Sequence, residues 1–347
     1  MQQAEKARKD AATLGATDVA GAAARYAAAD SLLDAAEQAD RRWLEPVVQR
    51  AQLGYLRSRL EREPRKVAAW LQLGLGHAQR ALDADPENPD ALEARGTIRF
   101  ARFSRGLEAD PAAADRLVEA ARVDLENATR LNRGQVGAWN VLSVLYYQRR
   151  DLLEANRAAR SAYEGDAYLA AADAILWRLF VTSYDLEMFP PAIDWCDKGR
   201  RRFPANRLFA HCQLMLMTSN AADPDVGLAW RLADEAVRLT PERDRPYQRL
   251  FEDIHVAAVL ARAGRADSAR HVLDRSKGDR QVDPQRELLG YEAFARTMLG
   301  DKDEALRLLD EYLVANPKHR EGFRKIVHWW WRPLQDDPRF KALIGAR

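Results

Sequence analysis

The sequence predicts an all-α solenoid of about seven helix–turn–helix repeats, wound into a right-handed superhelix and closed by capping helices at both ends. Three observations lead to this fold class: pairs of small residues seven positions apart, a proline or polar residue five positions after each pair, and a helical apolar pattern before it. Hydrophobic residues make up 47% of the 347 residues and charged residues 31%, so the chain can bury a continuous core beneath a charged surface. Because each repeat packs only on its neighbours, one core does not limit the length of such an array.

The small-residue pairs mark the second helix of each predicted repeat. Two residues seven positions apart lie on one face of a helix, where a neighbouring helix can approach closely. Proline cannot continue the helical hydrogen-bond ladder, so it ends the helix. The pairs, each with its stop, are Ala28 and Ala35 with Asp40, Gly74 and Ala81 with Pro86, Ala121 and Ala128 with Arg133, Ala155 and Ala162 with Ala167, Ala192 and Gly199 with Pro204, and Ala229 and Ala236 with Pro241. Ala305 and Tyr312 with Pro317 match in part, because only the first of the two residues is small.

The spacing of the stops indicates two kinds of repeat. Three successive intervals, from Arg133 to Pro241, measure 34, 37 and 37 residues. The two earlier intervals, which end at Pro86 and Arg133, measure 46 and 47 residues. We therefore expect irregular, longer repeats in 41–133, with extended helices or longer loops.

One predicted first helix carries Trp139, Leu142, Ser143 and Tyr146 ahead of the pair that begins at Ala155. This order of Trp, Leu, small residue and Tyr resembles the first helix of a tetratricopeptide repeat (TPR). A second match runs from Leu288 to Pro317, with Gly300 in the turn between helices and Ala305 opening the second helix; Gly264 and Ala269 repeat that arrangement. The resemblance covers roughly Asp18 to Pro317. It implies that first helices line a concave face and second helices a convex one.

The chain ends are expected to be caps, because terminal repeats have no neighbour to cover their apolar face. The predicted organisation is an N-terminal capping helix in 1–17, the repeat array in 18–317, and capping helices in 318–347. The closing segment, with its tryptophans, Pro333-Leu334 and Asp337-Pro338-Arg339-Phe340, is similar to that of bacterial TPR proteins, some of them fused to signalling kinases or cyclases. Because the chain begins directly in a helix, a fragment of a longer protein stays an open alternative.

Charge and hydropathy narrow the range of partners and compartments. Fifty-four Lys and Arg nearly balance 52 Asp and Glu, and the net charge of +2 provides no field that would follow a nucleic-acid backbone. The most apolar stretch, from Gly134 to Gln148, contains Gln135 and Asn140 and is too short to span a bilayer. The first residues lack the apolar centre of a signal peptide. We expect no nucleic-acid partner, no membrane insertion and a cytoplasmic location, or a periplasmic one if the chain is a fragment.

No motif indicates catalysis, a metal or a cofactor. Gly74-Leu75-Gly76 lacks the remainder of a phosphate-binding loop, and no serine stands in a nucleophile elbow. The six histidines are scattered without zinc-ligand spacing. The sequence therefore predicts a protein that is not an enzyme and holds neither cofactor nor metal.

The cysteines and the tryptophan run each allow two interpretations. Cys196 and Cys212 are interpreted as buried small hydrophobic residues, and a single disulfide outside the cytoplasm is the alternative. For Trp329, Trp330 and Trp331, we expect two indoles to close the end of the solenoid and the third to pack under Pro333-Leu334. The alternative is an exposed aromatic anchor for a partner.

The first helices would supply the partner-binding surface. Helical register predicts these contact residues: Asn140, Val144, Tyr147, Gln148, Trp177, Arg178, Tyr184, His211 and Met215. An aromatic and polar lining with few charges suits an extended peptide or a helix. The Lys and Asn clamp that TPR proteins use for a terminal carboxylate is not reproduced, because only Asn140 could match it.

The predicted function is a non-catalytic scaffold or adaptor that binds a peptide or protein segment in the concave groove. One alternative is a regulatory or sensory TPR segment of a larger bacterial signalling protein, and a less favoured one is a solenoid that binds a small ligand. The identity of the partner and the oligomeric state stay open.

Overall fold

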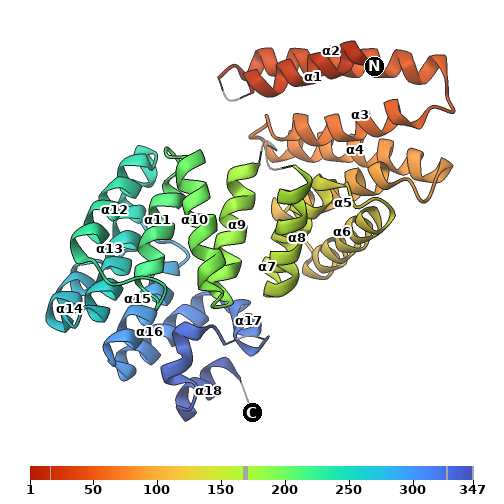
Figure 1. The fold of residues 1–347 in the computed structure, drawn as a ribbon. Helices are drawn as coiled ribbons and strands as arrows, with labels where there is room; N and C mark the ends of the chain where they lie inside the picture. The colour runs from red at the N-terminus through yellow and green to blue at the C-terminus, as the bar shows by residue number, and fades with distance from the viewer. Residues whose placement is uncertain (16, 167–170, 326, 346–347) are drawn as a thin grey trace. The chain divides into compact units, whose positions relative to one another are not determined.

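The computed structural model describes residues 1–15, 17–166, 171–325 and 327–345 and is helical throughout, with no strand among these residues (Figure 1). Consecutive helices pair into hairpins, which confirms the all-α, TPR-like solenoid. The predicted stop at Ala167 lies outside the described residues. The right-handed superhelix and the division into caps and array stay predictions.

The chain forms two compact units. The first unit contains residues 1–145 and the end of α8; the second contains the last residues of α7, the rest of α8 and everything from α9 onward. The helices of the first unit are α1 (Gln2–Leu14), α2 (Val19–Ala39), α3 (Leu44–Ser58), α4 (Pro64–Ala84), α5 (Pro89–Ser104), α6 (Pro111–Leu131) and most of α7 (Val136–Gln148). The second unit holds most of α8 (Leu152–Gly165), then α9 (Ala172–Asp185), α10 (Phe189–Arg202), α11 (Arg207–Met217), α12 (Val226–Leu239), α13 (Arg245–Arg262), α14 (Ala266–Arg275), α15 (Glu287–Leu299) and α16 (Lys302–Ala315).

Helix ends follow the predicted stops. Pro86, Pro204, Pro241 and Pro317 each stand two residues beyond the last residue of a second helix. The longer repeats of 41–133 arise from longer helices, because α4 and α6 have 21 residues each whereas α10, α12 and α16 have 14.

Small residues let helices approach closely, as the pairs predict. Gly74 on α4 faces α3, and a Cβ at position 74 would lie 2.8 Å from the carbonyl oxygen of Ala51. On the other side it would lie 2.8 Å from Cδ1 of Ile98 on α5. Ala81, the second member of this pair, is fully buried. The pair therefore marks the contact face of α4.

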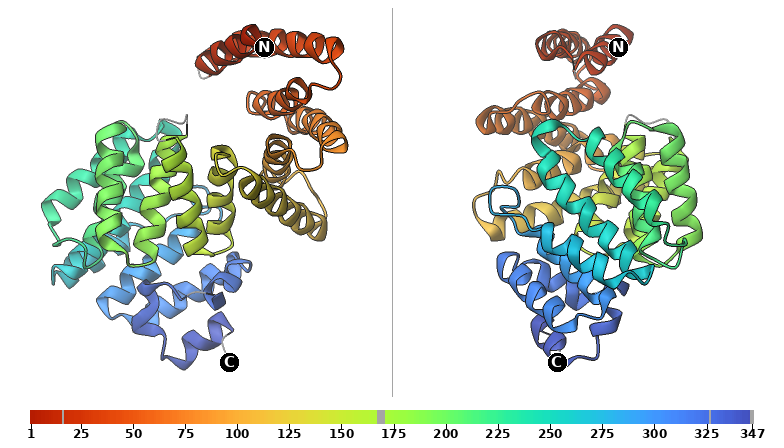
Figure 2. Two further views of the ribbon diagram at one scale, coloured as in Figure 1. Left: turned by 45° about the vertical axis from the view of Figure 1, so that its right-hand side comes forward. Right: turned by 90° about the vertical axis from the view of Figure 1, so that its left-hand side faces the viewer.

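The C-terminal elements cover the apolar end of the second unit. They are α17 (His319–Lys325), the 3₁₀ helix η2 (Trp329–Leu334) and α18 (Pro338–Ile344), all drawn in blue (Figure 2). The other 3₁₀ helix described, η1 (Glu242–Asp244), lies between α12 and α13. Trp331, Leu334 and Phe340 join the core to which α15 and α16 contribute. Trp330 packs against the same core, so two indoles cover this end as expected, whereas the third, Trp329, is bound to α9. A 3₁₀ helix has three residues per turn and directs successive side chains to different sides, so Trp329 packs on α9 and Trp330 on α15.

Cys196 on α10 and Cys212 on α11 form a disulfide, with their Cα atoms 5.8 Å apart. Both residues are fully buried. The interpretation as two buried cysteines without a bond was wrong on the pairing. A separation of 16 residues places the two side chains opposite each other, because α10 turns directly into α11 and packs against it.

Candidate interaction site

Tyr147, on the last turn of α7, is part of a polar cluster in the second unit. Its hydroxyl donates to Asp185 Oδ2 at 3.1 Å, and the Arg178 guanidinium lies 4.4 Å from the centre of its ring. His328 Nε2 lies 3.1 Å from Asp185 Oδ1, and Arg150 Nη1 lies 3.8 Å from Asp185 Oδ2. Burial and the Asp185 carboxylate raise the pKa of Tyr147, so its hydroxyl keeps its proton and stays a donor.

A row of aromatic side chains crosses the first helices of the second unit. We define the aromatic row as Trp177, His211, Phe251, Tyr291 and Trp330. Successive ring centres are 6.2 Å, 4.7 Å, 4.8 Å and 6.2 Å apart, within the range of favourable aromatic pairs. All except His211 are half-buried. The row thus presents aromatic groups on both sides of the buried His211.

His211 on α11 is held in place by Glu252 on α13. Its Nδ1 lies 2.8 Å from Glu252 Oε2, and Gln248 Nε2 donates to Glu252 Oε1 at 2.6 Å. Burial alone would raise the pKa of Glu252, but the charge and the hydrogen bond of His211 lower it. Burial, with His211 adding to it, lowers the pKa of the neighbouring His255 to about 3. His255 is therefore neutral, and its Nδ1–H donates to the Phe251 carbonyl at 2.9 Å.

The tryptophan segment is tied to α9. Trp329 Nε1 donates to the Tyr184 carbonyl at 3.2 Å, and Trp330 Nε1 donates to the Tyr184 hydroxyl at 3.2 Å. That hydroxyl also lies 2.8 Å from Thr218 Oγ1. Trp330 stacks on Phe294 with ring centres 3.9 Å apart. Both indole N–H groups thus bind Tyr184, about 145 residues away, rather than solvent.

The predicted contact residues differ in exposure. Tyr147, Trp177 and Arg178 are half-buried and lie together in the second unit, and Gln148 beside them is exposed. Tyr184, His211 and Met215 are buried, so in this structure they support the surface rather than form it. Asn140 and Val144 are half-buried and belong to the first unit. Binding by any of these residues stays a prediction.

Sequence reasoning missed Asp185, Phe251 and Tyr291. The sequence does contain a signal for Phe251 and Tyr291. Positions 177, 211, 251 and 291 carry an aromatic or histidine residue at intervals of 34, 40 and 40 residues, each close to the length of one repeat. Asp185 has no such signal, since its role depends on His328, which lies 143 residues further along the chain.

The described residues show little sign of other chemistry. Among them, no group of three or more His, Cys, Asp or Glu side chains is arranged to hold a metal ion. In the same part of the chain, no helix is both long enough and apolar enough to span a membrane.

Comparison with known proteins gives similarity at the level of fold. No protein-family model matches the chain, and no curated protein matches it significantly. Among solved structures, the chain is similar to the Cut9–Hcn1 heterotetramer of APC/C, with 12% identity, a TM-score of 0.48, and coverage of 94% of this chain and 59% of that one. It is also similar to yeast Tom70, with 14% identity, a TM-score of 0.39, and coverage of 94% and 63%.

A third similar structure is YrrB, described as a TPR protein with an unusual peptide-binding site. It shares 12% identity with a TM-score of 0.30, and the match covers 72% of this chain and 96% of YrrB. The present chain spans less than two thirds of the length of the Tom70 and Cut9 chains. Identities and TM-scores this low do not carry a function from those proteins to this one.

Proposed function

We propose that the chain is a non-catalytic protein-interaction scaffold whose aromatic row holds an extended peptide or protein segment. The proposal rests mainly on the row itself: half-buried aromatic residues lie on three first helices, α9, α13 and α15, and on η2, with the buried His211 of α11 between them. Aromatic residues are enriched among the side chains that contribute most to protein interfaces. The polar cluster around Tyr147 would give the ligand hydrogen-bonding groups next to the apolar surface.

The titratable groups near the row support a binding role over a catalytic one. The Glu252 carboxylate is held by His211 and Gln248, and the Asp185 carboxylate by Tyr147 and His328. A general base needs a free position beside the atom from which it takes a proton. In our proposal these carboxylates position the aromatic side chains and take no part in a reaction. The proposal includes no nucleic-acid partner, because the 54 Lys and Arg nearly balance the 52 Asp and Glu.

The disulfide between Cys196 and Cys212 bears on the compartment. Disulfides persist in oxidising compartments and are rare in the cytosol. Our proposal therefore places the chain in an oxidising compartment, in contrast to the cytoplasmic location that the sequence favours. Membership of the TPR family and a bacterial origin are part of the same proposal.

Selection from a random peptide library on the intact chain tests the scaffold proposal. Selected peptides should bind the Trp177→Ala variant at least about tenfold more weakly, the usual effect of removing a large interface side chain. Trp43→Ala is the matched control, because Trp43 is 39% exposed and lies on the first unit. Peptides that bind both variants as tightly as the unchanged chain would remove the aromatic row from the proposal.

A further inference from the structure

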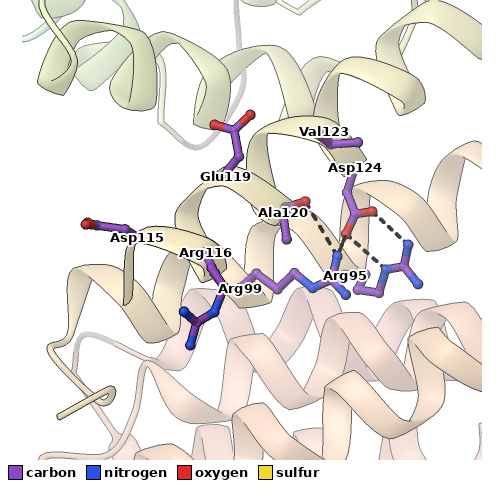
Figure 3. A pocket seen from close by; sticks show the side chains of 8 residues that line it. All are labelled: Arg95, Arg99, Asp115, Arg116, Glu119, Ala120, Val123 and Asp124. Atoms are coloured by element: carbon purple, nitrogen blue, oxygen red, sulfur yellow. Dashed lines mark hydrogen bonds and ion pairs between the residues drawn. The ribbon is translucent and has the colours of Figure 1, made fainter. Parts of the chain in front are cut away.

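A hollow of about 660 Å³ lies between α5 and α6 of the first unit (Figure 3). Its lining comes from one first helix, which supplies Arg95 and Arg99, and from one second helix, which supplies the remainder. It is thus built on different elements from the aromatic row, and it is independent of the proposed function.

Two arginines share one carboxylate at the base of this hollow. Arg95 donates to Asp124 through Nε at 2.9 Å and Nη2 at 2.7 Å, and its Nη1 donates to Gln79 Oε1 at 2.9 Å. Arg99 donates to Asp124 Oδ2 through Nη1 at 2.5 Å. Asp124 is almost fully buried, with its side chain 4% exposed. Two guanidinium groups against one carboxylate leave an uncompensated positive charge at the base.

The two guanidinium groups differ in what they still offer. Every nitrogen of Arg95 already donates to a neighbour. Arg99 uses Nη1 alone, for Asp124 and, at 3.5 Å, for the Ala120 carbonyl. Its Nε and Nη2 make no hydrogen bond to any described residue, and its side chain is 25% exposed. These two N–H groups form the edge of a guanidinium that binds a carboxylate through two parallel hydrogen bonds.

Charges around the rim do not occupy that edge. The carboxylates of Asp115 and Glu119 point away from the Arg99 guanidinium (Figure 3), and Glu119 accepts from Arg122 Nε at 3.0 Å. Arg116 lies at the rim with a side chain that is 73% exposed. Its guanidinium forms an ion pair with Asp110, at 3.7 Å, and points away from that of Arg99 (Figure 3).

The wall beside Arg99 is apolar. Ala120 and Val123 line the hollow one helical turn apart, and Val123 is 43% exposed. A ligand that suits both features has a carboxylate next to an aliphatic side chain. We propose that this hollow binds an acidic residue, flanked by an aliphatic one, of a partner peptide, with Arg99 as the bidentate donor.

The arrangement differs from the Lys and Asn clamp of TPR proteins, which lies on successive first helices. Here a second helix forms the wall, and an arginine whose geometry is set by a buried aspartate forms the contact. Replacing Arg99 with lysine keeps the charge and removes the two parallel donors, so the Arg99→Lys variant separates geometry from charge.

Titration with acetyl-Leu-Glu-Leu amide tests the proposal, with the Arg99 Nε–Hε signal followed by NMR in the full chain. We expect a saturable shift with this peptide, and binding at least about tenfold weaker for the Gln counterpart, acetyl-Leu-Gln-Leu amide. Arg99→Lys and Arg99→Gln should weaken binding of the Glu peptide to a similar degree. The control Arg105→Gln, at the exposed C-cap of α5, should leave it unchanged.

Several results would overturn the proposal: no saturable shift at millimolar peptide, equal binding of the Glu and Gln peptides, or unchanged binding by both Arg99 variants. An equal loss of binding in Arg105→Gln would show attraction to net charge alone and would also overturn it. Circular dichroism establishes whether the variants fold. If they do not, the comparison of the two peptides on the unchanged chain still decides.

Discussion

Glu93 shows how the environment of one residue can make stability depend on pH. It lies on α5 with one carboxylate oxygen buried and without a hydrogen-bond partner, close to the first turn of α7. Burial raises the pKa of Glu93 to about 7, against a hydrogen bond from the Ala138 N–H that lowers it. The folded chain thus holds this proton more tightly than the unfolded chain. Its contribution to stability is complete below pH 4.5 and is lost as the pH rises through 7.

We expect Glu93→Gln to remove this pH dependence. Glutamine resembles the protonated side chain, so the variant should match the unchanged chain at pH 4. At pH 8 it should be more stable by about 2 kcal/mol, from 1.36 kcal/mol per pKa unit with allowance for relaxation. Urea unfolding of both proteins at the two pH values measures the difference, with Glu87→Gln, an exposed position, as the control. A stability difference that is the same at pH 4 and pH 8 would contradict the role of Glu93.

Two glycines on α4 provide a test of the helix contact face that the sequence predicts. A Cβ at Gly74 would meet the backbone of α3, which cannot move without shifting the helix, whereas a Cβ at Gly76 would meet nothing within 4 Å. Gly74→Ala should therefore destabilise the chain by about 1–3 kcal/mol, as overpacking does. Gly76→Ala should stabilise it by about 0.5–1 kcal/mol, because alanine favours a helix over glycine. Thermal unfolding followed by circular dichroism measures both changes in stability. Equal effects of the two substitutions would refute the assignment of Gly74 to the contact face of α4.

The tryptophan segment gives a second test at the level of elements. Trp330 stacks on Phe294, and its indole N–H donates to the Tyr184 hydroxyl. Removing the indole therefore leaves a void beside Phe294 and takes one hydrogen-bond partner from the Tyr184 hydroxyl. We expect Trp330→Ala to lower the free energy of unfolding by about 3 kcal/mol, the low end for large core truncations because the side chain is half-buried. Trp43→Ala, at an exposed position, should cost less than about 1 kcal/mol. If the two variants lost the same stability in urea, Trp330 would be an accessory surface residue.

The elements also show which features a sequence can predict. Proline positions and small-residue pairs predicted helix ends and contact faces, because helix termination and close packing depend on residues a few positions apart. The pairing of Tyr184 with Trp329 and Trp330 could not be predicted, since periodicity relates a helix to its neighbours and not to a segment about 145 residues away. For the same reason, register placed Tyr184, His211 and Met215 on the right helices, whereas their burial depends on what covers them.

At the scale of the whole molecule, the disulfide should affect one unit and spare the other. Cys196 and Cys212 both lie in the second unit, and repeat arrays transmit stability mainly between neighbouring repeats. Closing a loop of this length stabilises a chain by about 3 kcal/mol in the chain-entropy model. Reduction should therefore lower the unfolding temperature of the second unit and leave the unfolding temperature of α1–α6 in the first unit unchanged.

Thiol titration and calorimetry test this expectation together. The chain from an oxidising preparation should show no free thiol after unfolding without reductant and two after reduction, since the sequence has two cysteines. In calorimetry, dithiothreitol should shift one transition to lower temperature, and the Cys196→Ala, Cys212→Ala double variant should reproduce that shift without responding to dithiothreitol. Two free thiols in the unreduced chain would contradict the bond and, with it, the proposed oxidising compartment. A single transition that shifts as a whole would instead show that the two units unfold together, because a local crosslink can lower a common transition only if the units are strongly coupled.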